Sequence, residues 1–294
     1  MNRCCTYLLP IRRTSFCAVE VEEFRDYFAG LQAAGCEVIV VEGSAQQIFE
    51  RHHDNWSNVC RHKAVDPRFR YLNDKVNGLH TGISLATSEK VILADDDIRY
   101  RPGDVEKINR ATLRIADYPG TCAFRRSTIL NAGEYDGDVL LDNEEIIRHF
   151  ARAGSRICYA NNFFIHKRPS KFRKWLEQRP RQAYEDFELR FKTILFASVL
   201  PIALAVAIID IRYMSIFLLS ILLAAVGWAR GNARKYFPFN ICFFAPFWIF
   251  ERALSAYWAF YWFLTRGGYP FGNRLLSKGT GRDWIEGGKI AARE

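Results

Sequence analysis

The sequence has no arrangement of cysteine and histidine that would mark a metal-binding or redox motif. Its 294 residues include eight cysteines, but no two of them form a C-x-x-C pair and none forms a metal-like grouping with histidine. Such cysteines are typical of buried thiols in a reducing compartment. An N-terminal secretion signal is missing too, because charged residues begin at Arg3 and no apolar core follows. We therefore expect the first domain to stay in the cytoplasm.

Nucleic-acid recognition motifs are also missing, although the net charge is +9. We find neither a recognition helix nor a base-stacking sheet motif, so no nucleic-acid partner is predicted. The basic residues concentrate at 167–190, just before a long apolar region, which fits anionic lipid headgroups better. No Gly-rich phosphate loop follows the first strand, which ends in Pro10-Ile11-Arg12-Arg13, and this disfavours nucleotidyl transfer.

What the sequence does have is a run of three carboxylates, Asp95, Asp96 and Asp97, at the end of a short apolar segment, 90–94. An apolar run of this length and composition predicts a buried strand. Open α/β sheets bind ligands at the carboxyl ends of their strands. Adjacent acids repel one another unless a cation neutralises them, and carboxylates are the usual protein ligands of Mg²⁺ and Mn²⁺. Taken alone, the triplet is more often a solvated acidic turn.

Two more predicted strands and a basic loop precede the triplet. The opening strand runs into Pro10, and a second strand at 36–41 ends at Glu42-Gly43-Ser44. Residues 71–87 form a Gly-containing loop that enters a helix and carries Lys75, a mobile point charge suited to a diphosphate.

Further signals follow the triplet in order. They are a strand at 118–127, an acidic helix start at 141–148 and the segment Gln178-Arg179-Pro180-Arg181-Gln182. This series resembles the family-two glycosyltransferases that are associated with bacterial membranes. The resemblance implies the GT-A fold, an α/β fold in which a mixed Rossmann-like sheet is flanked by helices, here followed by transmembrane or interfacial helices.

The resemblance also implies a chemistry. A nucleotide sugar, expected to be a UDP-sugar, would pass its sugar with inversion to a lipid-linked or membrane-proximal acceptor, with Mg²⁺ or Mn²⁺ as cofactor. Asp97 and Asp95 would hold the metal, and Asp142 would be the catalytic base, with Glu144 and Glu145 as alternatives one helical turn away. The donor-binding residues would be Pro10, Glu42, Ser44, Lys75, Asp95, Asp96, Gln178 and Arg181.

Two departures from the family pattern matter. The tryptophan of the family's Q-x-x-R-W motif is replaced by Gln182, which disfavours processive polymerisation. Only residues 98–117 separate Asp97 from the strand that faces the sugar, so the acceptor side is shortened. A nucleotide-sugar-binding pseudoenzyme with a truncated acceptor side is therefore the alternative.

The last third of the chain contains long apolar runs. Those at 193–209 and 214–229 predict a transmembrane hairpin, each being slightly short for a span of roughly 20 residues. A third run at 238–264 is interrupted by Glu251 and Arg252 and is rich in Trp and Tyr, which favours a re-entrant or interfacial helix pair. We thus expect a cytoplasmic GT-A domain at 1–190, a membrane region at 191–265 and a basic cytoplasmic tail at 266–294, in a multi-pass protein of the inner (plasma) membrane.

Overall fold

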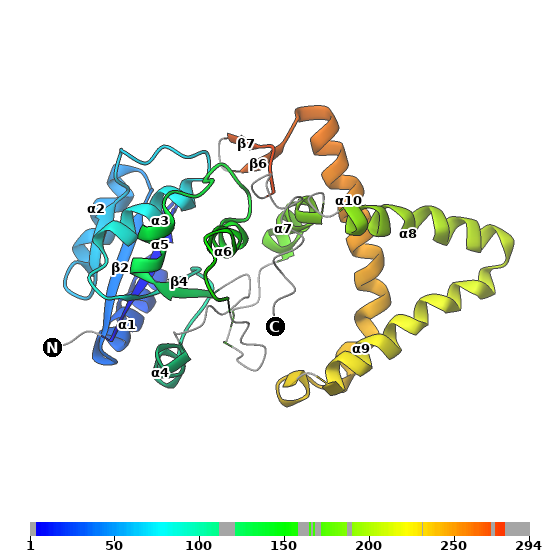
Figure 1. The fold of residues 1–294 in the computed structure, drawn as a ribbon, viewed down its shortest axis with the longest axis horizontal. Coiled ribbons are helices and arrows are strands. Elements are labelled where there is room, and N and C mark those ends of the chain that lie inside the picture. The colour runs from blue at the N-terminus through cyan, green and yellow to red at the C-terminus, as the bar shows by residue number, and fades with distance from the viewer. Residues whose placement is uncertain are drawn as a thin grey trace. The chain divides into compact units, whose positions relative to one another are not determined.

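The fold is taken from a computed structural model (Figure 1). It describes residues 4–111, 121–157, 165, 167, 172–186, 190–230, 232–271 and 274–279. The chain divides into two compact units. The first contains Met1–Ala160, Phe164–Pro169 and Glu286–Glu294, and the second contains Asn161–Phe163 and Ser170–Ile285. Each unit is described by itself.

A five-stranded sheet forms the centre of the first unit. Its strands are β1 (Cys5–Ile11), β2 (Cys36–Glu42), β3 (Arg61–Ala64), β4 (Lys90–Ala94) and β5 (Thr121–Arg125). Their order is β3-β2-β1-β4-β5, with β5 antiparallel to β4 and the other pairs parallel. Strands β1, β2 and β4 are apolar almost throughout because helices cover both faces of the sheet. The predicted mixed α/β sheet is confirmed.

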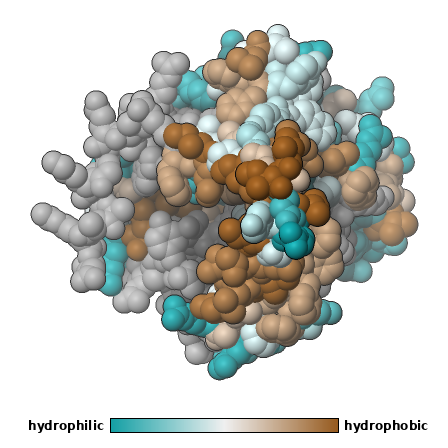
Figure 2. Space-filling model, turned by 90° about the vertical axis from the view of Figure 1, so that its right-hand side faces the viewer, coloured by the Kyte–Doolittle hydropathy of each residue, from teal (hydrophilic) through white to brown (hydrophobic). Residues whose placement is uncertain are grey.

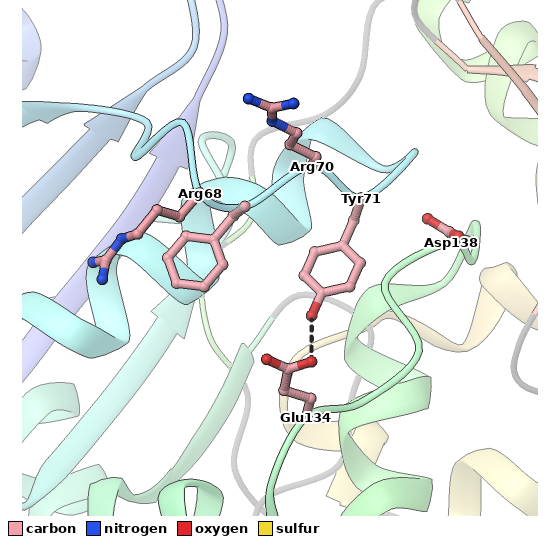
Figure 3. A pocket seen from close by; sticks show the side chains of 6 residues that line it. Arg68, Arg70, Tyr71, Glu134 and Asp138 are labelled. Atoms are coloured by element: carbon pink, nitrogen blue, oxygen red, sulfur yellow. Dashed lines mark hydrogen bonds between the residues drawn. The ribbon is translucent and has the colours of Figure 1, made fainter.

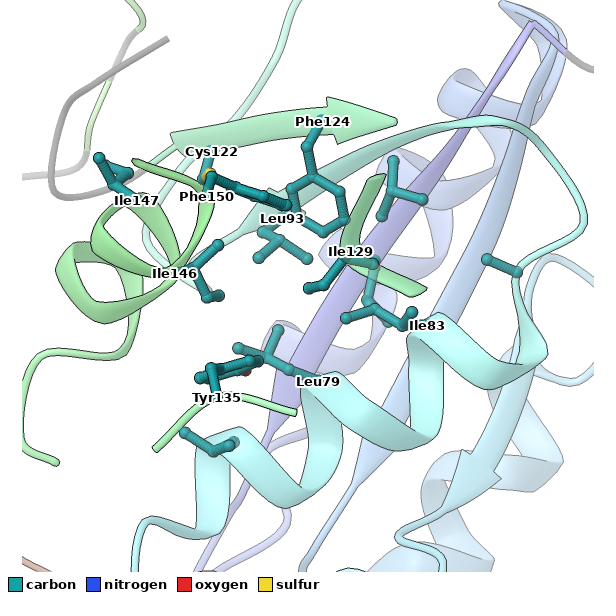
Figure 4. Packing of buried hydrophobic residues seen from close by; sticks show 14 of the residues in the cluster. Leu79, Ile83, Leu93, Cys122, Phe124, Ile129, Tyr135, Ile146, Ile147 and Phe150 are labelled. Carbon is teal, nitrogen blue, oxygen red and sulfur yellow. The ribbon is translucent and has the colours of Figure 1, made fainter. Parts of the chain in front are cut away.

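The helices of this unit connect the strands. They are α1 (Ala18–Ala33), α2 (Gln46–Trp56), α3 (Asp74–Leu85), α4 (Pro102–Ala111), α5 (Arg126–Ala132) and α6 (Asp142–Arg152). On one face, side chains from α3, α5 and α6 meet the sheet in a continuous apolar core (Figure 4). Leu79, Ile129 and Phe150 represent the three helices in it.

Helix α3 lies unusually close to β1 because it presents glycine there. A Cβ on Gly82 would lie 2.0 Å from Leu8 Cδ1, and one on Gly78 would lie 2.9 Å from Pro10 Cβ. These two glycines therefore set the helix-to-strand distance. This close packing brings the first turn of α3 beside the end of β1.

The second unit is mostly helical. Its elements are α7 (Phe172–Asp186), α8 (Arg190–Ile209), η1 (Ile211–Leu218), α9 (Leu219–Arg230), η2 (Asn232–Lys235), η3 (Phe239–Phe244), α10 (Ala245–Arg266), β6 (Tyr269–Phe271) and β7 (Arg274–Leu276). Helix α10 packs against α7 and α8. Strands β6 and β7 form an antiparallel pair.

Two segments of this unit, Phe191–Ile209 and Ile211–Arg230, are long and apolar enough to span a membrane. Almost none of their residues is buried within the protein. Figure 2 faces the side on which α8 and α9 lie in Figure 1, and hydrophobic residues cover most of its coloured surface. The two segments coincide with the predicted hairpin, whose turn is at Asp210.

The third apolar run forms the short η3 and one long helix, α10, with no break at its charged pair. After the short η3, α10 continues unbroken through Glu251 and Arg252. Arg252 Nη2 donates to the carbonyl of Gln182 on α7 at 2.7 Å, and Arg179 Nη1 lies 3.9 Å from Glu251 Oε2. Because α7 supplies partners for both charges, α10 does not have to break where they occur. Its path relative to a membrane stays a prediction.

Candidate active site

The order of the sheet reverses between β1 and β4, and the candidate site lies at the carboxyl ends of these strands. Pairing between β1 and β4 covers Thr6 to Leu8 and stops there, so Pro10 lies beyond the shared ladder. Asp95, Asp96 and Asp97 follow β4 directly. A switch point of this kind leaves a crevice outside the strand ends, where open α/β sheets bind their ligands.

Lys75 joins two of the predicted acidic residues. Its Nζ lies 2.7 Å from Asp95 Oδ1 and 2.7 Å from Asp142 Oδ2. Lys75 is in the first turn of α3 and Asp142 is the first residue of α6, so two helix N-termini meet the end of β4 here. The structure thus brings together three predicted site residues that are far apart in the sequence.

Hydrogen bonds between the two helix starts hold this arrangement. Asn73 caps α3, accepting from Lys75 N at 3.0 Å, and its Nδ2 donates to the carbonyl of Val139 at 2.8 Å. Leu72 N donates to Asp138 Oδ1 at 2.7 Å. The loop before α6 therefore positions the first turn of α3, and with it Lys75 and Asp142.

Burial and charge act against each other in this cluster. Burial by itself would lower the pKa of Lys75, but the carboxylates of Asp142 and Asp95 outweigh it and raise this pKa above its ordinary value. Burial raises the pKa of Asp95, and the nearby Asp142 adds to this effect while Lys75 opposes it. The lysine is therefore firmly cationic, and it compensates carboxylates that burial would otherwise disfavour.

Asp97 has the coordination capacity that a metal ligand needs. Its Oδ2 lies 3.3 Å from Lys167 Nζ, whereas its Oδ1 is buried without a hydrogen-bond partner among the described residues. A buried carboxylate oxygen without a partner is costly unless a cation meets it. Together with Asp95, it offers the oxygen ligands that Mg²⁺ and Mn²⁺ prefer. The residues present therefore fit the predicted divalent metal.

Asp96 faces the loop after β1. Its Oδ2 lies 2.9 Å from Arg13 Nη1, and Arg13 Nη2 also lies 2.6 Å from Glu20 Oε1. The backbone N–H of Arg13 donates to Ser44 Oγ at 2.7 Å. Arg13 thus connects the ends of β1, β2 and β4, and it adds a second cation at the site.

Glu42 is in a different environment from the one we expected. Its fully buried carboxylate accepts from His52 Nδ1 at 2.8 Å and lies 2.9 Å from His62 Nε2. Burial alone would raise the pKa of Glu42, but the hydrogen bonds from His52, His62 and Ser44 outweigh it and lower this pKa to about 2. To contact a nucleoside, Glu42 would have to leave both imidazoles. Its role toward the donor stays a prediction.

The two alternative bases have other partners. Glu145 is fully buried and pairs with Arg152, while Glu144 Oε1 lies 3.3 Å from Arg148 Nε. Of the three acidic residues predicted at the start of α6, Asp142 is the one paired with Lys75.

Gln178 and Arg181 belong to the second unit. Both lie on α7, where the Arg181 guanidinium stacks over the Phe271 ring at 4.6 Å. Their assignment to the donor stays a prediction. Residues 118–120, the start of the predicted strand at 118–127, lie outside the described residues.

A pocket of about 500 Å³ adjoins the loop before α3 (Figure 3). It is lined by Arg68, Phe69, Arg70, Tyr71, Glu134 and Asp138. Tyr71 Oη donates to Glu134 Oε2 at 3.4 Å across it. Because Asp138 also holds Leu72, the pocket shares a wall with the loop that positions Lys75.

Sequence reasoning missed Arg13, His52, His62 and Asn73 as parts of the site and its supports. Asn73 was recognisable as an N-cap, since it directly precedes a helix. The two histidines gave no such signal, because their shared partner is 10 residues from one and 20 from the other.

Comparison with known proteins by sequence finds no matching family model and no matching curated protein. Among solved structures, the chain is similar to the mannosyltransferase PcManGT from Pyrobaculum calidifontis, in complex with GDP-Man and Mn²⁺. The TM-score is 0.51 at 16% identity, and 88% of each chain is covered. A proposed nucleotide-diphospho-sugar transferase from Desulfovibrio desulfuricans G20 aligns with a TM-score of 0.36 at 11% identity, over 53% of this chain and 79% of that one. The first likeness confirms that this chain has the GT-A glycosyltransferase fold.

Proposed function

We propose that this protein is a metal-dependent inverting glycosyltransferase that moves a sugar from a nucleotide sugar to a lipid-linked or membrane-proximal acceptor. The observation that carries the proposal is the cluster at the switch point. There Lys75 holds Asp95 and Asp142 at 2.7 Å each, and Asp97 keeps a buried oxygen without a partner among the described residues. The likeness to a glycosyltransferase fold supports the same reaction class.

The donor's diphosphate suits the charges of the site. Asp97 and Asp95 would hold Mg²⁺ or Mn²⁺, which when bound would neutralise the charge that develops on the departing diphosphate. Lys75, Arg13 and Lys167 are each ion-paired with a member of the triplet. Donor binding would replace such internal ion pairs with pairs to phosphate.

Asp142 would accept the proton of the acceptor hydroxyl. In one displacement the hydroxyl oxygen bonds to the anomeric carbon, the bond to the diphosphate breaks, and the proton passes to the carboxylate. Asp142 is buried and held by Lys75 in the structure. If Lys75 turns to the diphosphate, Asp142 becomes free to act as a base only after the donor has bound.

The second unit would anchor the protein in the membrane. The segments Phe191–Ile209 and Ile211–Arg230 would cross as a hairpin, with Arg230, Arg234 and Lys235 on the cytoplasmic side. Helix α10 would lie at the interface, since its Glu251 and Arg252 are engaged by the polar helix α7. The first unit and the tail would then both face the cytoplasm, where sugar nucleotides are made available to the site.

Cysteine labelling tests this topology. A cysteine introduced at position 280, outside the described residues, should resist a membrane-impermeant thiol reagent in intact cells and react after permeabilisation. Labelling from outside would instead mean three complete spans and an external tail.

A donor screen tests the proposed activity. We expect one class among the UDP-, GDP- and dTDP-sugars to raise the melting temperature of the full-length protein in lipid nanodiscs when Mn²⁺ is present. Lipid extract should then accept the sugar. Stabilisation by a donor without either transfer or hydrolysis would favour the pseudoenzyme with a truncated acceptor side. No stabilisation by any donor would contradict the proposal.

A further inference from the structure

Three cysteine thiols lie close together at the amino ends of strands β1 and β2, whereas the candidate active site lies at the carboxyl ends of the strands. Cys5 and Cys36 are the first residues of β1 and β2 and are register partners, and Cys4 precedes β1 directly. The Cys5 and Cys36 sulfurs lie 3.5 Å apart, and those of Cys4 and Cys5 lie 3.7 Å apart. All three sulfurs lie within 4.8 Å of one another.

We propose that Cys4, Cys5 and Cys36 form a binding site for one thiophilic cation, such as Zn²⁺ or Cu⁺. Three sulfurs at about 2.3 Å from a shared ion stand roughly 3.8–4.0 Å apart, depending on whether the ion is tetrahedral or trigonal. The Cys5–Cys36 and Cys4–Cys5 sulfur distances differ from that spacing by a few tenths of an ångström. Small side-chain rotations would therefore let all three sulfurs coordinate one ion.

The composition of the group selects the cation. No histidine nitrogen or carboxylate oxygen of the described residues belongs to it. Thiolate ligands favour Zn²⁺ and Cu⁺ over Mg²⁺ and Mn²⁺, which prefer oxygen. The thiol cluster and the Asp95–Asp97 cluster therefore differ in metal preference. They also lie at opposite ends of the sheet, the thiols at the starts of β1 and β2 and the acids after the end of β4.

A backbone hydrogen bond holds the cluster in place, and one of its three thiols is partly exposed. Cys4 N donates to the carbonyl of Gly35 at 3.0 Å, and Gly35 has φ +83°, so the turn between α1 and β2 holds the start of β1. Cys5 and Cys36 are buried, whereas Cys4 is partly exposed. A cation would therefore enter from the side of Cys4. A disulfide would use only two of the three sulfurs, whereas one cation would bind all three. The close approach of all three sulfurs therefore favours a bound cation over a disulfide.

Binding would tie the start of β1 to the start of β2. Each thiol that coordinates the ion releases its proton to solvent, and no redox change is involved. The ion would stabilise the native state, because the unfolded chain does not hold the three thiols together. Because the site lies at the far end of β1 and β2, we expect it to raise stability without contacting the donor.

Cadmium titration of the reduced, chelator-treated, full-length protein in nanodiscs tests this proposal. We expect thiolate-to-metal absorption that saturates at one Cd²⁺ per chain, together with a higher melting temperature. Zn²⁺ should compete for the site, and Mn²⁺ should not. Cys4→Ser and Cys36→Ser should each abolish tight binding of this one Cd²⁺ ion.

Matched variants separate this site from other thiols and from the active site. Cys17→Ser removes an exposed thiol, Cys60→Ser removes a buried thiol elsewhere, and Asp97→Ala alters the other cluster. All three variants should still bind one Cd²⁺ ion per chain. Cys4 is the partly exposed thiol of the cluster, so Cys4→Ser should keep the fold. Circular dichroism of this variant distinguishes loss of metal binding from loss of fold. Retention of the signal in a folded Cys4→Ser variant would overturn the proposal, as would a native disulfide between Cys5 and Cys36 in protein from reducing cytoplasm.

Discussion

The two units use the same kinds of apolar side chain in opposite ways. In the first unit, Leu79 on α3 is fully buried in a continuous core. In the second, Leu222 on α9 is 62% exposed, and almost none of either candidate span is buried. Exposed apolar surface on this scale marks a surface that something else covers. The difference teaches that the first unit carries its own core, whereas the second leaves apolar surface that lipid would cover under the proposed function.

An ion pair of the second unit also contrasts with the ion pairs of the first unit in burial and position. In the first unit, buried acids pair with buried or half-buried cations at the strand ends, as Asp142 does with Lys75. In the second, Asp210 and Arg212 pair with each other at the turn between the apolar segments, at 2.5 Å, with Arg212 exposed. These ion pairs of the first unit therefore lie at the candidate site, whereas the Asp210–Arg212 pair lies between two candidate membrane spans.

The largest effect should come from the base. Asp142→Asn removes the proton acceptor at the site, so sugar transfer should fall by about 10²–10⁴-fold while donor affinity changes little. Steady-state transfer rates and donor calorimetry on the same preparation check this. Glu144→Gln, on the same helix turn but paired with Arg148, is the matched control. If that control loses transfer and Asp142→Asn does not, the assignment is wrong.

Matched leucine truncations measure the contrast between the units directly. Leu79→Ala should cost about 2–5 kcal/mol of unfolding free energy, because it leaves a cavity in the core. Leu222→Ala in nanodiscs should cost far less, since lipid fills the vacated space. Chemical denaturation followed by one probe in each unit gives the two values. Equal costs would mean that α9 is packed as a protein core, against its observed exposure.

Acid should weaken the first unit through Glu42. The folded-state pKa of Glu42 is about 2, below its ordinary value of 4.5, so its carboxylate contributes stability above pH 4.5. That contribution is on the order of 3 kcal/mol and is lost as the pH falls from 4.5 toward 2. We expect the stability difference between wild type and Glu42→Gln to shrink over this window. A difference independent of pH would show that the carboxylate's charge is not what the two histidines stabilise.

Glycine substitutions on two helices should give the smallest of these effects, with opposite signs. Gly82→Ala places a Cβ 2.0 Å from Leu8 Cδ1 and should destabilise the fold by about 1–3 kcal/mol. Gly30→Ala on α1 meets nothing within 4 Å and should stabilise it by about 0.5–1 kcal/mol. Thermal unfolding of the two variants side by side checks this. Loss of stability in both would mean that close packing of α3 on β1 is not the cause.

Local patterns predicted individual strands, and the family resemblance that they carry implied the fold. The predicted strand at 90–94 matches β4, and the acidic triplet follows it as expected. The contact of Lys75 with Asp95 follows from the sheet order, because α3 precedes β4 and starts at the same edge. The pairing of Glu42 with His52 and His62 did not follow from any pattern. It depends on the register of β2 and β3 and on how α2 packs, and neither is encoded in a local motif.

The thiol cluster was not predicted from the sequence, for the same reason. Cys4 and Cys5 adjoin in sequence, but Cys36 joins them only because β1 and β2 pair in a register that sets Cys5 opposite Cys36. The sequence also did not predict that α10 is continuous through Glu251 and Arg252. A charged pair inside an apolar run suggested a break, and only the tertiary contacts show that α7 satisfies both charges.

The central claim is that Asp97, beside the Lys75 cluster, makes donor binding depend on a divalent metal. Calorimetric titration of the donor into the full-length protein, with and without Mn²⁺, tests this most directly. We predict metal-dependent binding in wild type and in Asp26→Ala, an exposed acid on α1, and no metal-dependent binding in a folded Asp97→Ala variant. Unchanged, Mn²⁺-dependent donor affinity in Asp97→Ala would contradict the account.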